Sequence, residues 1–205
     1  KRRAATVLNH TATHLLHMVL KQVLGDHAIQ KGSLVEPERL RFDFAHQAPM
    51  TEDEIREVEM RVNQQIRANH QASVRVTTPE EAIASGAVAL FGEKYGSKVR
   101  VVNFGPSVEL CGGTHADHTG DIGIFKITSE SGVAAGIRRI EAVTGDGALR
   151  YIEKSEQTAK QKIAQAEERA HQLEKDIAVL KDKIAALYTR DLMSQLKLVG
   201  DINVL

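Results

Sequence analysis

The sequence has only one cysteine, no tryptophan and few aromatic residues, which make up 4% of its 205 positions. One cysteine cannot form a disulfide within the chain, and so few thiols are typical of a cytoplasmic protein, which we expect here. No apolar run approaches the roughly 18 residues of a membrane-spanning helix, so we expect no membrane partner. The single thiol therefore needs an explanation other than a disulfide.

The chain also has no net charge at neutral pH, because 27 Lys and Arg residues balance 27 Asp and Glu residues. Without a global positive field, any contact with RNA must be local or come from a neighbouring domain. The composition, 42% hydrophobic and 26% charged, is sufficient for one domain with a core and an appended segment. The start KRRAATVLNH has no methionine or signal sequence, and the end DINVL is apolar and uncapped. We therefore expect a fragment of a longer protein.

Short helices and strands alternate through the first 145 residues. Helices are predicted where apolar residues recur at i, i+3 and i+4, and Thr51 with Glu54 forms a capping box for one of them. Strands are predicted where apolar and polar residues alternate, with Gly105-Pro106 joining two of them. The predicted helices are 6–24, 51–68 and 79–85. The predicted strands are 40–44, 73–77, 98–104, 107–112 and 121–130. Residues 131–145 are predicted to be a glycine-rich loop followed by a final strand.

A sustained heptad pattern follows Gly145. From about residue 146 to 190 there is no proline, and there is no glycine after Gly147. Apolar and small residues recur in steps of three and four from Ile152 to Leu187, as in the seam of a coiled coil or a helical hairpin. We expect this helix to pack against another, either in the rest of a longer chain or in a second copy, and the second case would be self-association through the helix. A solvated single helix is the alternative.

Two histidines, His10 and His14, stand four positions apart in HTATH on one face of the first predicted helix. Their Cβ atoms would lie about 5–6 Å apart, so both imidazoles could bind one ion. Cys111 and His115 flank a turn of small residues in CGGTH, where thiolate and imidazole can converge. Three nitrogens and one sulfur favour zinc over magnesium or calcium, which prefer oxygen. A nucleophilic thiol with a histidine base is the alternative, and it lacks a family signature.

These patterns together predict an α+β fold, with an antiparallel or mixed sheet and helices packed around a zinc cleft. A long C-terminal helix or helical hairpin follows. The change of character near Gly147 divides the chain into a zinc-binding domain, residues 1–147, and a helical, coiled-coil-like segment, residues 148–205. The other histidines show no pairing and are interpreted as ordinary surface or core-edge residues; they are His17, His27, His46, His70, His118 and His171.

Five stretches stand out in order along the chain: HTATHLL, KGSLVEPERLRFDF, GAVALFGEKYG, ELCGGTH and TGDIGIFKITSESGVAAGIRRIEAVTG. Together they resemble the editing domain, also called the second additional domain, of the alanyl-tRNA synthetase family. The resemblance covers residues 1 to about 147, and the four candidate ligands fall on the family's zinc positions. The heptad segment resembles the linker to that synthetase's C-terminal domain. Related zinc domains occur in freestanding deacylases and in threonyl-tRNA synthetase, but ALFGEKYG and the heptad tail favour the alanine enzyme.

The resemblance implies an ester hydrolase that corrects charging errors. A pocket for alanine cannot exclude the smaller glycine and discriminates poorly against serine, which adds one hydroxyl. A second site that hydrogen-bonds this hydroxyl can remove the wrong amino acid. The implied reaction is hydrolysis of tRNA(Ala) mischarged with serine or glycine, and the implied partners are the tRNA(Ala) acceptor end and the remaining synthetase domains. No part of the class II aminoacylation core is recognisable, so charging of tRNA is not expected.

Four positions are candidates for the catalytic pocket and one for tRNA binding. The Thr13 hydroxyl, between the two helical histidines, could bond the substrate serine, or it could bond its own helix carbonyl four residues earlier. Gln30, placed in a QKGS loop, matches a family pocket position, with a solvated loop residue as the alternative. The backbone N–H groups of Gly112 and Gly113 could approach an oxyanion or carbonyl. Arg138 matches a family position for the tRNA 3′ end; surface solvation is the alternative.

Two mechanisms and two other functions stay open. Zinc could activate water or polarise the ester carbonyl through an open position. Alternatively, four protein ligands close its shell, zinc organises the pocket, and a water held by Thr13, the backbone and the terminal ribose attacks. We favour the second mechanism because four good ligands are available. The other functions are a non-catalytic, zinc-stabilised module that presents tRNA or the helical arm to a partner, and a purely structural dimerisation fragment.

Overall fold

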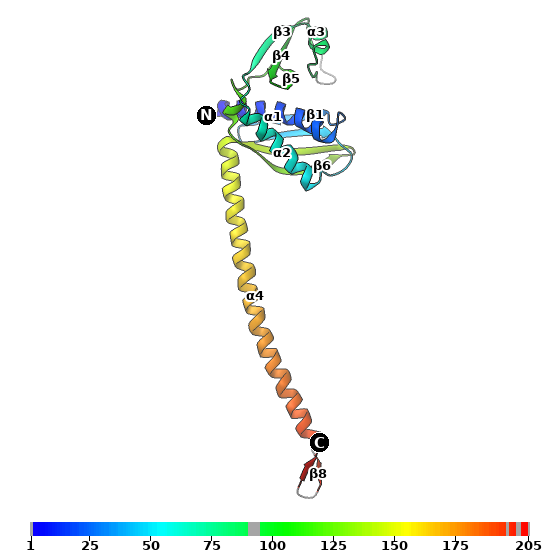
Figure 1. Ribbon diagram of the computed structural model, residues 1–205, viewed down its shortest axis with the longest axis vertical. Helices are drawn as coiled ribbons and strands as arrows, with labels where there is room; N and C mark the ends of the chain where they lie inside the picture. The colour runs from blue at the N-terminus through cyan, green and yellow to red at the C-terminus, as the bar shows by residue number, and fades with distance from the viewer. Residues whose placement is uncertain (1, 90–94, 196, 200–201, 205) are drawn as a thin grey trace. The chain divides into compact units, whose positions relative to one another are not determined.

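The computed structural model describes residues 2–89, 95–195, 197–199 and 202–204. The chain divides into two compact units, residues 1–152 and 153–205. The first unit combines antiparallel sheets with packed helices, and one long helix runs into the second unit (Figure 1). The predicted α+β class with a long C-terminal helix is confirmed. The first unit ends close to Gly147, where the sequence predicts the domain boundary.

A four-stranded antiparallel sheet forms one layer of the first unit. Leu40, Phe42 and Phe44 alternate along its second strand and are fully buried, because they share the face that carries the core. The period-two pattern that predicts this strand therefore also predicts its buried face. The strand order across the sheet is β1 (Gln30–Val35), β2 (Leu40–Ala45), β7 (Ile137–Thr144) and β6 (Phe125–Ala134).

Two helices, α1 (Arg2–Leu24) and α2 (Glu52–Arg67), contribute to the same core as this sheet. Their apolar residues recur at helical spacing and face the aromatic residues of the strands; Leu16 of α1 is completely buried. The predicted capping box of α2 is confirmed. The Thr51 hydroxyl accepts from the N–H of Glu54, and the Glu54 carboxylate accepts from the N–H of Thr51 at 2.7 Å.

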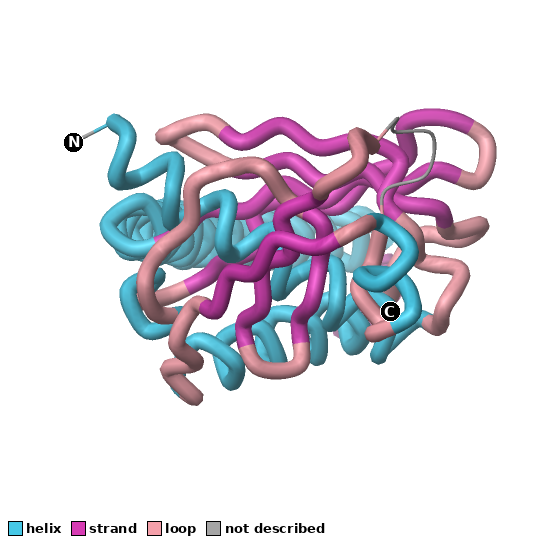
Figure 2. Tube along the Cα trace, turned by 90° about the horizontal axis from the view of Figure 1, so that it is seen from above, coloured by secondary structure: helices cyan, strands magenta, loops and turns pink. Residues whose placement is uncertain are grey.

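A second, three-stranded sheet lies on the other side of α1. Its central strand is buried on both faces, since Val101 packs in a small core with a short helix while Val102 and Phe104 join the main core. Figure 1 shows α1 between the two sheets, and Figure 2 shows strands crossing the foreground when the first unit is seen from above. This enclosure brings distant segments onto α1. The elements are β3 (Ser73–Thr77), α3 (Pro79–Ala84), β4 (Val99–Phe104) and β5 (Ser107–Leu110).

Three local predictions in the first unit are wrong. Gln30 does not lie in a loop but begins β1, which pairs with β2. Thr119–Ile122 forms a 3₁₀-helix, η1, so the strand predicted over 121–130 begins only at Phe125. Residues 131–134, predicted as a loop, continue β6, and the hairpin turns at Gly136 with a φ of 68° that favours glycine. Pairing with neighbouring strands, which local composition does not encode, sets these boundaries.

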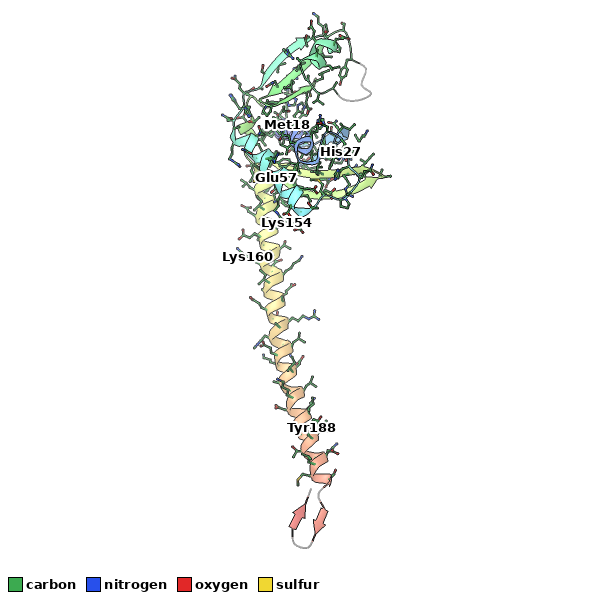
Figure 3. The ribbon with its side chains drawn as sticks, turned by 45° about the vertical axis from the view of Figure 1, so that its right-hand side comes forward. Met18, His27, Glu57, Lys154, Lys160 and Tyr188 are labelled. Carbon is green, nitrogen blue, oxygen red and sulfur yellow. The ribbon has the colours of Figure 1, made fainter. Side chains whose placement is uncertain are left out.

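The heptad segment forms one uninterrupted helix, α4 (Gly145–Gln195). Every side chain from residue 149 to 194 is exposed, and Leu173 of the predicted seam is 53% exposed. Figure 3 shows the side chains of Lys160 and Tyr188 standing out from this helix. The structure thus has a long helix rather than a helical hairpin, and the described residues leave its seam uncovered.

The described residues after Gln195, in the segment 148–205 that was predicted to be helical and coiled-coil-like, form strands rather than helix. After α4, β8 (Lys197–Val199) and β9 (Ile202–Val204) pair as an antiparallel hairpin. Among all the helices described, none combines the length and the apolar character needed to cross a membrane.

Candidate metal centre

Four side chains from two distant segments meet beside α1. His10 and His14 lie one turn apart on this helix, and Cys111 and His115 come from the loop after β5. One ligand atom from each residue lies within 4.8 Å of all the others. The imidazole rings of His10 and His115 stack with their centroids 4.1 Å apart. His14 is buried and the other three are half-buried, so this His₃Cys cluster is partly exposed.

The loop that carries Cys111 is held in place by its own backbone contacts. Arg100 of β4 donates hydrogen bonds from its guanidinium to the carbonyl oxygens of Cys111 and Gly113. A Cβ at Gly113 would overlap the imidazole ring of His10, whereas a Cβ at Gly112 would meet nothing within 4 Å. The second glycine of CGGTH is therefore needed for the close approach of loop and helix, and the first is not.

Hydrogen bonds at Nδ1 orient two of the imidazoles. Nδ1 of His10 lies 3.1 Å from the carbonyl oxygen of Thr114, so it must carry the proton and donate. Nδ1 of His115 lies 3.2 Å from the hydroxyl of Thr11, whose own proton goes to a helix carbonyl one turn earlier. The Nε2 atoms of His10 and His115 then keep their lone pairs, and they lie 3.5 and 3.4 Å from Sγ of Cys111. Metal-binding histidines are typically oriented by such outward hydrogen bonds.

Burial keeps the imidazoles of the cluster neutral. It is the largest cause that lowers the pKa of His10, and together with the neighbouring imidazoles it lowers the pKa of His14 well below its usual value. Burial, then the charges of His10 and Arg100, lowers the pKa of His115 to about 3. A neutral imidazole offers the lone pair that a metal ion requires. Donor types, spacing and protonation therefore all fit a metal ion with a preference for nitrogen and sulfur.

A buried carboxylate lies behind the cluster. Glu109 of β5 is 7% exposed, and its Oε1 lies 2.9 Å from Nδ1 of His17. Its Oε2 lies 3.5 Å from Nδ1 of His14, without the alignment of a full hydrogen bond. Glu109 was not among the residues predicted from the sequence, and His17 was predicted to be an ordinary surface or core-edge histidine. The available signal was spacing: His17 follows His14 by three residues, and Glu109 precedes Cys111 by two.

The two predicted pocket side chains, Thr13 and Gln30, lie in regular secondary structure. Thr13 is 4% exposed, and its hydroxyl donates to the carbonyl oxygen of Asn9 at 2.8 Å, which is the local bond considered as the alternative. Gln30 begins β1, where its Nε2 lies 3.5 Å from the hydroxyl of Ser33. Their roles toward a substrate stay predictions.

The predicted tRNA contact, Arg138, lies on β7 in a two-bond pair with a carboxylate. Its Nε and Nη2 atoms lie 2.5 and 2.6 Å from the two oxygens of Glu130. The Glu130 carboxylate raises the pKa of Arg138 above its usual value. The neighbouring Arg139 pairs instead with Asp43, as alternate faces of a strand require. A phosphate would therefore compete with Glu130 for Arg138, whose tRNA role stays a prediction.

Comparison with protein families identifies the class of domain. The family model described as the threonyl and alanyl tRNA synthetase second additional domain matches residues 99–141. This segment runs from β4 into β7 and includes Cys111 and His115 of the cluster. The match thus covers β4 and β5 of the smaller sheet, the cluster loop, and β6 with most of β7 of the larger sheet.

Individual relatives narrow the class to one synthetase. The chain is 52% identical over 217 positions to the alanine–tRNA ligase of Polaromonas sp., covering 99% of the chain and 25% of the ligase. It is 52% identical over 221 positions to that of Burkholderia orbicola and 50% identical over 218 to that of Burkholderia mallei. The chain belongs to the alanyl-tRNA synthetase family and spans about a quarter of the length of these relatives. Of its ALFGEKYG stretch, residues 90–94 lie outside the described residues.

Proposed function

We propose that this chain is a zinc-dependent aminoacyl-tRNA deacylase, the proofreading part of an alanyl-tRNA synthetase. The approach of four donor atoms, from His10, His14, Cys111 and His115, to within 4.8 Å of one another carries the proposal. Neutral imidazoles and a thiolate are ligands that zinc prefers. The relatives are alanine–tRNA ligases, which supports tRNA(Ala) as the nucleic-acid partner and the cytoplasm as the compartment.

The proposed reaction is hydrolysis of the ester that joins serine or glycine to tRNA(Ala). A synthetic pocket for alanine cannot reject these two amino acids well, so a separate hydrolytic site has a physical purpose. Thr13 already gives its proton to the carbonyl of Asn9, so its oxygen can only accept from the hydroxyl of a bound serine. The amide of Gln30 can both donate and accept. These two side chains are the proposed recognition groups.

The four cluster residues would hold the zinc ion, His10 and His115 through Nε2. Zinc, when bound, supplies a positive charge that orders the pocket and polarises nearby polar bonds. The N–H of Gly113 donates to Sγ of Cys111 at 3.4 Å, so it stabilises the thiolate. Of the two predicted oxyanion donors, Gly112 is therefore the one proposed to face the substrate.

Metal content and deacylation, measured on the same preparation, test this proposal. We expect zinc to be bound and both Ser-tRNA(Ala) and Gly-tRNA(Ala) to be hydrolysed, with Ala-tRNA(Ala) spared. Cys111→Ala should abolish both zinc binding and turnover. A minimal aminoacyl ester should be assayed as well, because weak tRNA binding by a quarter-length chain would mimic an inactive site. Bound zinc without turnover on either substrate would refute catalysis.

A second candidate function is a non-catalytic module for tRNA binding or dimerisation. The exposed heptad seam of α4, with residues such as Ile163 at 58% and Leu187 at 55% exposure, favours it. Sedimentation of the whole chain and of a chain ending at Ile152 separates the two. Loss of self-association in the shorter chain, combined with tRNA binding but no deacylation in the whole chain, would support the module.

A further inference from the structure

We propose that Glu109 is a positioning residue of the metal centre, which holds the imidazole of His14 with Nδ1 toward the carboxylate and Nε2 toward the cluster. The inference rests on the proposed zinc site and assigns a part to a residue outside the ligand set. It explains why a carboxylate lies buried in the short strand that leads into Cys111.

One carboxylate approaches two histidines. Oε1 of Glu109 lies 2.9 Å from Nδ1 of His17, and Oε2 lies 3.5 Å from Nδ1 of His14. An ionised carboxylate only accepts hydrogen bonds, so His17 must present its N–H at Nδ1. The same tautomer is assigned to His14, whose Nδ1 faces the other oxygen of the carboxylate. The lone pair of His14 is then at Nε2, on the opposite side of the ring. His10 and His115 also carry their proton at Nδ1, where they donate to the carbonyl of Thr114 and the hydroxyl of Thr11. With His14 in the same tautomer, all three imidazoles of the cluster would offer Nε2 to a metal ion.

Burial makes this carboxylate irreplaceable. His14, His17 and Glu109 are 4%, 2% and 7% exposed. Nδ1 of His14 is closed to solvent, and in the described part of the chain no aligned hydrogen bond satisfies it. Oε2 of Glu109 is the acceptor that lies nearest in an ion-pair geometry. If the carboxylate were lost, Nδ1 of His14 would lose this acceptor, and the ring could rotate or change tautomer.

Two regular elements hold the three residues together. Glu109 lies near the end of β5, two positions before Cys111 in the loop that follows, and one helical turn separates His14 from His17 on α1. Nε2 of His17 has no hydrogen-bond partner in the described chain, and His17 lines a cavity of about 300 Å³ beside β5. The hydrogen bond to Glu109 is therefore what orients His17, and His17 in turn anchors the carboxylate. Rigid supports of this kind are what a precise ligand geometry needs.

Glu109→Gln tests the inference, because the amide keeps the shape of the side chain but can accept from only one of the two Nδ1–H groups. Zinc affinity would be measured by competition with a chromophoric chelator, and ligand geometry by the absorption bands of the cobalt-loaded protein. We expect zinc binding to weaken about 10–100-fold and the cobalt bands to shift. Thermal unfolding of the metal-free protein gives the structural cost separately.

Asp43→Asn is the matched control. Asp43 is 8% exposed and pairs with Arg139 on the larger sheet, so its loss should lower stability without changing zinc affinity or the cobalt bands. If Glu109→Gln behaves like Asp43→Asn, Glu109 is merely structural and the inference is wrong. If the unmodified protein binds no zinc, the proposed function fails. If it binds zinc and Glu109→Gln binds it equally well, only the present inference fails.

His17→Leu adds a second, independent check. Removing the anchor should weaken zinc binding less than Glu109→Gln does, because Oε2 stays near His14. The double variant should be no weaker than Glu109→Gln alone, since both changes act through one carboxylate. If the double variant lost zinc affinity equal to the sum of the two single losses, His17 and Glu109 would act independently, and the proposed sharing of one carboxylate would be wrong.

Discussion

Two long helices, α1 and α4, arise from similarly periodic sequences but have opposite surroundings. α1 lies between two sheets, and its buried residues include the polar Asn9, Thr11 and His14. In α4, all side chains from residue 149 to 194 are exposed. Buried polar side chains need partners, and in α1 these come from distant segments. Asn9 donates to the carbonyl of Glu36 and accepts from Thr144, and Thr11 contacts His115 of the loop after β5. A helix with buried polar residues therefore indicates a site, whereas an exposed apolar seam indicates only a surface.

Replacing one histidine in each helix by alanine is the strongest test of this difference between α1 and α4. His14→Ala removes a proposed ligand and leaves Glu109 without its neighbour, so zinc binding should fall by more than the roughly 10–100-fold expected for an outer residue. His171→Ala in α4, where the side chain is 69% exposed, should change nothing. Metal content after dialysis and chelator competition measures both. Equal zinc binding by the two variants would contradict the assignment of His14.

The two adjacent glycines of CGGTH provide a smaller but sharper contrast. A Cβ at Gly113 overlaps His10, so Gly113→Ala should push loop and helix apart and weaken zinc binding about tenfold or more. Gly112→Ala adds a methyl group into open space and should leave zinc affinity nearly unchanged. The same chelator titration applies. A larger loss for Gly112→Ala than for Gly113→Ala would contradict the described packing of the loop.

Matched leucines compare the packing of the two helices. Leu16 of α1 is fully buried and Leu173 of α4 is 53% exposed. Leu16→Ala should lower the free energy of unfolding by about 2–5 kcal/mol, because it removes apolar contact and leaves a cavity. Leu173→Ala should change it by less than about 0.5 kcal/mol. Urea unfolding of the metal-free protein, followed by circular dichroism, measures both. A large cost for Leu173→Ala would show that the seam of α4 is covered in solution.

Local patterns in the sequence were sufficient for most of the elements and for naming all four residues of the cluster. The i, i+4 spacing placed His10 and His14 together, and the capping box at Thr51 located α2. Local composition failed at Gln30 and at residues 131–134, where pairing with a neighbouring strand decides the structure. The small residues of CGGTH predicted that Cys111 and His115 could converge, and the structure brings both to α1. The role of all four residues as ligands stays a prediction.

The supporting contacts of the cluster could not be predicted, because each joins residues that are far apart in the sequence. Thr11 meets His115, and His17 meets Glu109, across separations of 104 and 92 residues. A threonine in a helix or a glutamate in a strand carries no local sign of such a partner. These contacts follow only from the enclosure of α1 by both sheets.

The smallest expected difference in stability is between an ion pair of the four-stranded sheet and an ion pair of α4. Asp43 accepts two hydrogen bonds from Arg139 at 2.7 and 2.8 Å, and these bonds lower the pKa of the Asp43 carboxyl. A lowered pKa stabilises the folded state above the usual pKa of an unfolded Asp, about 4, and this stabilisation is lost as the pH falls through the lowered value. Asp43→Asn should therefore cost on the order of 1 kcal/mol at neutral pH, and the cost should shrink in acid.

The control for this pair is Glu156 of α4, which is exposed and lies 2.7 Å from Lys160 one helical turn away. An exposed helical pair contributes only about 0.3–0.5 kcal/mol, so Glu156→Gln should have a barely measurable cost at any pH. Urea unfolding of both variants and the unmodified chain, in a pH series from neutral to strongly acidic, gives the comparison. A cost of Asp43→Asn that stays constant across the series would show that packing, rather than the charge on Asp43, makes this contact stabilising.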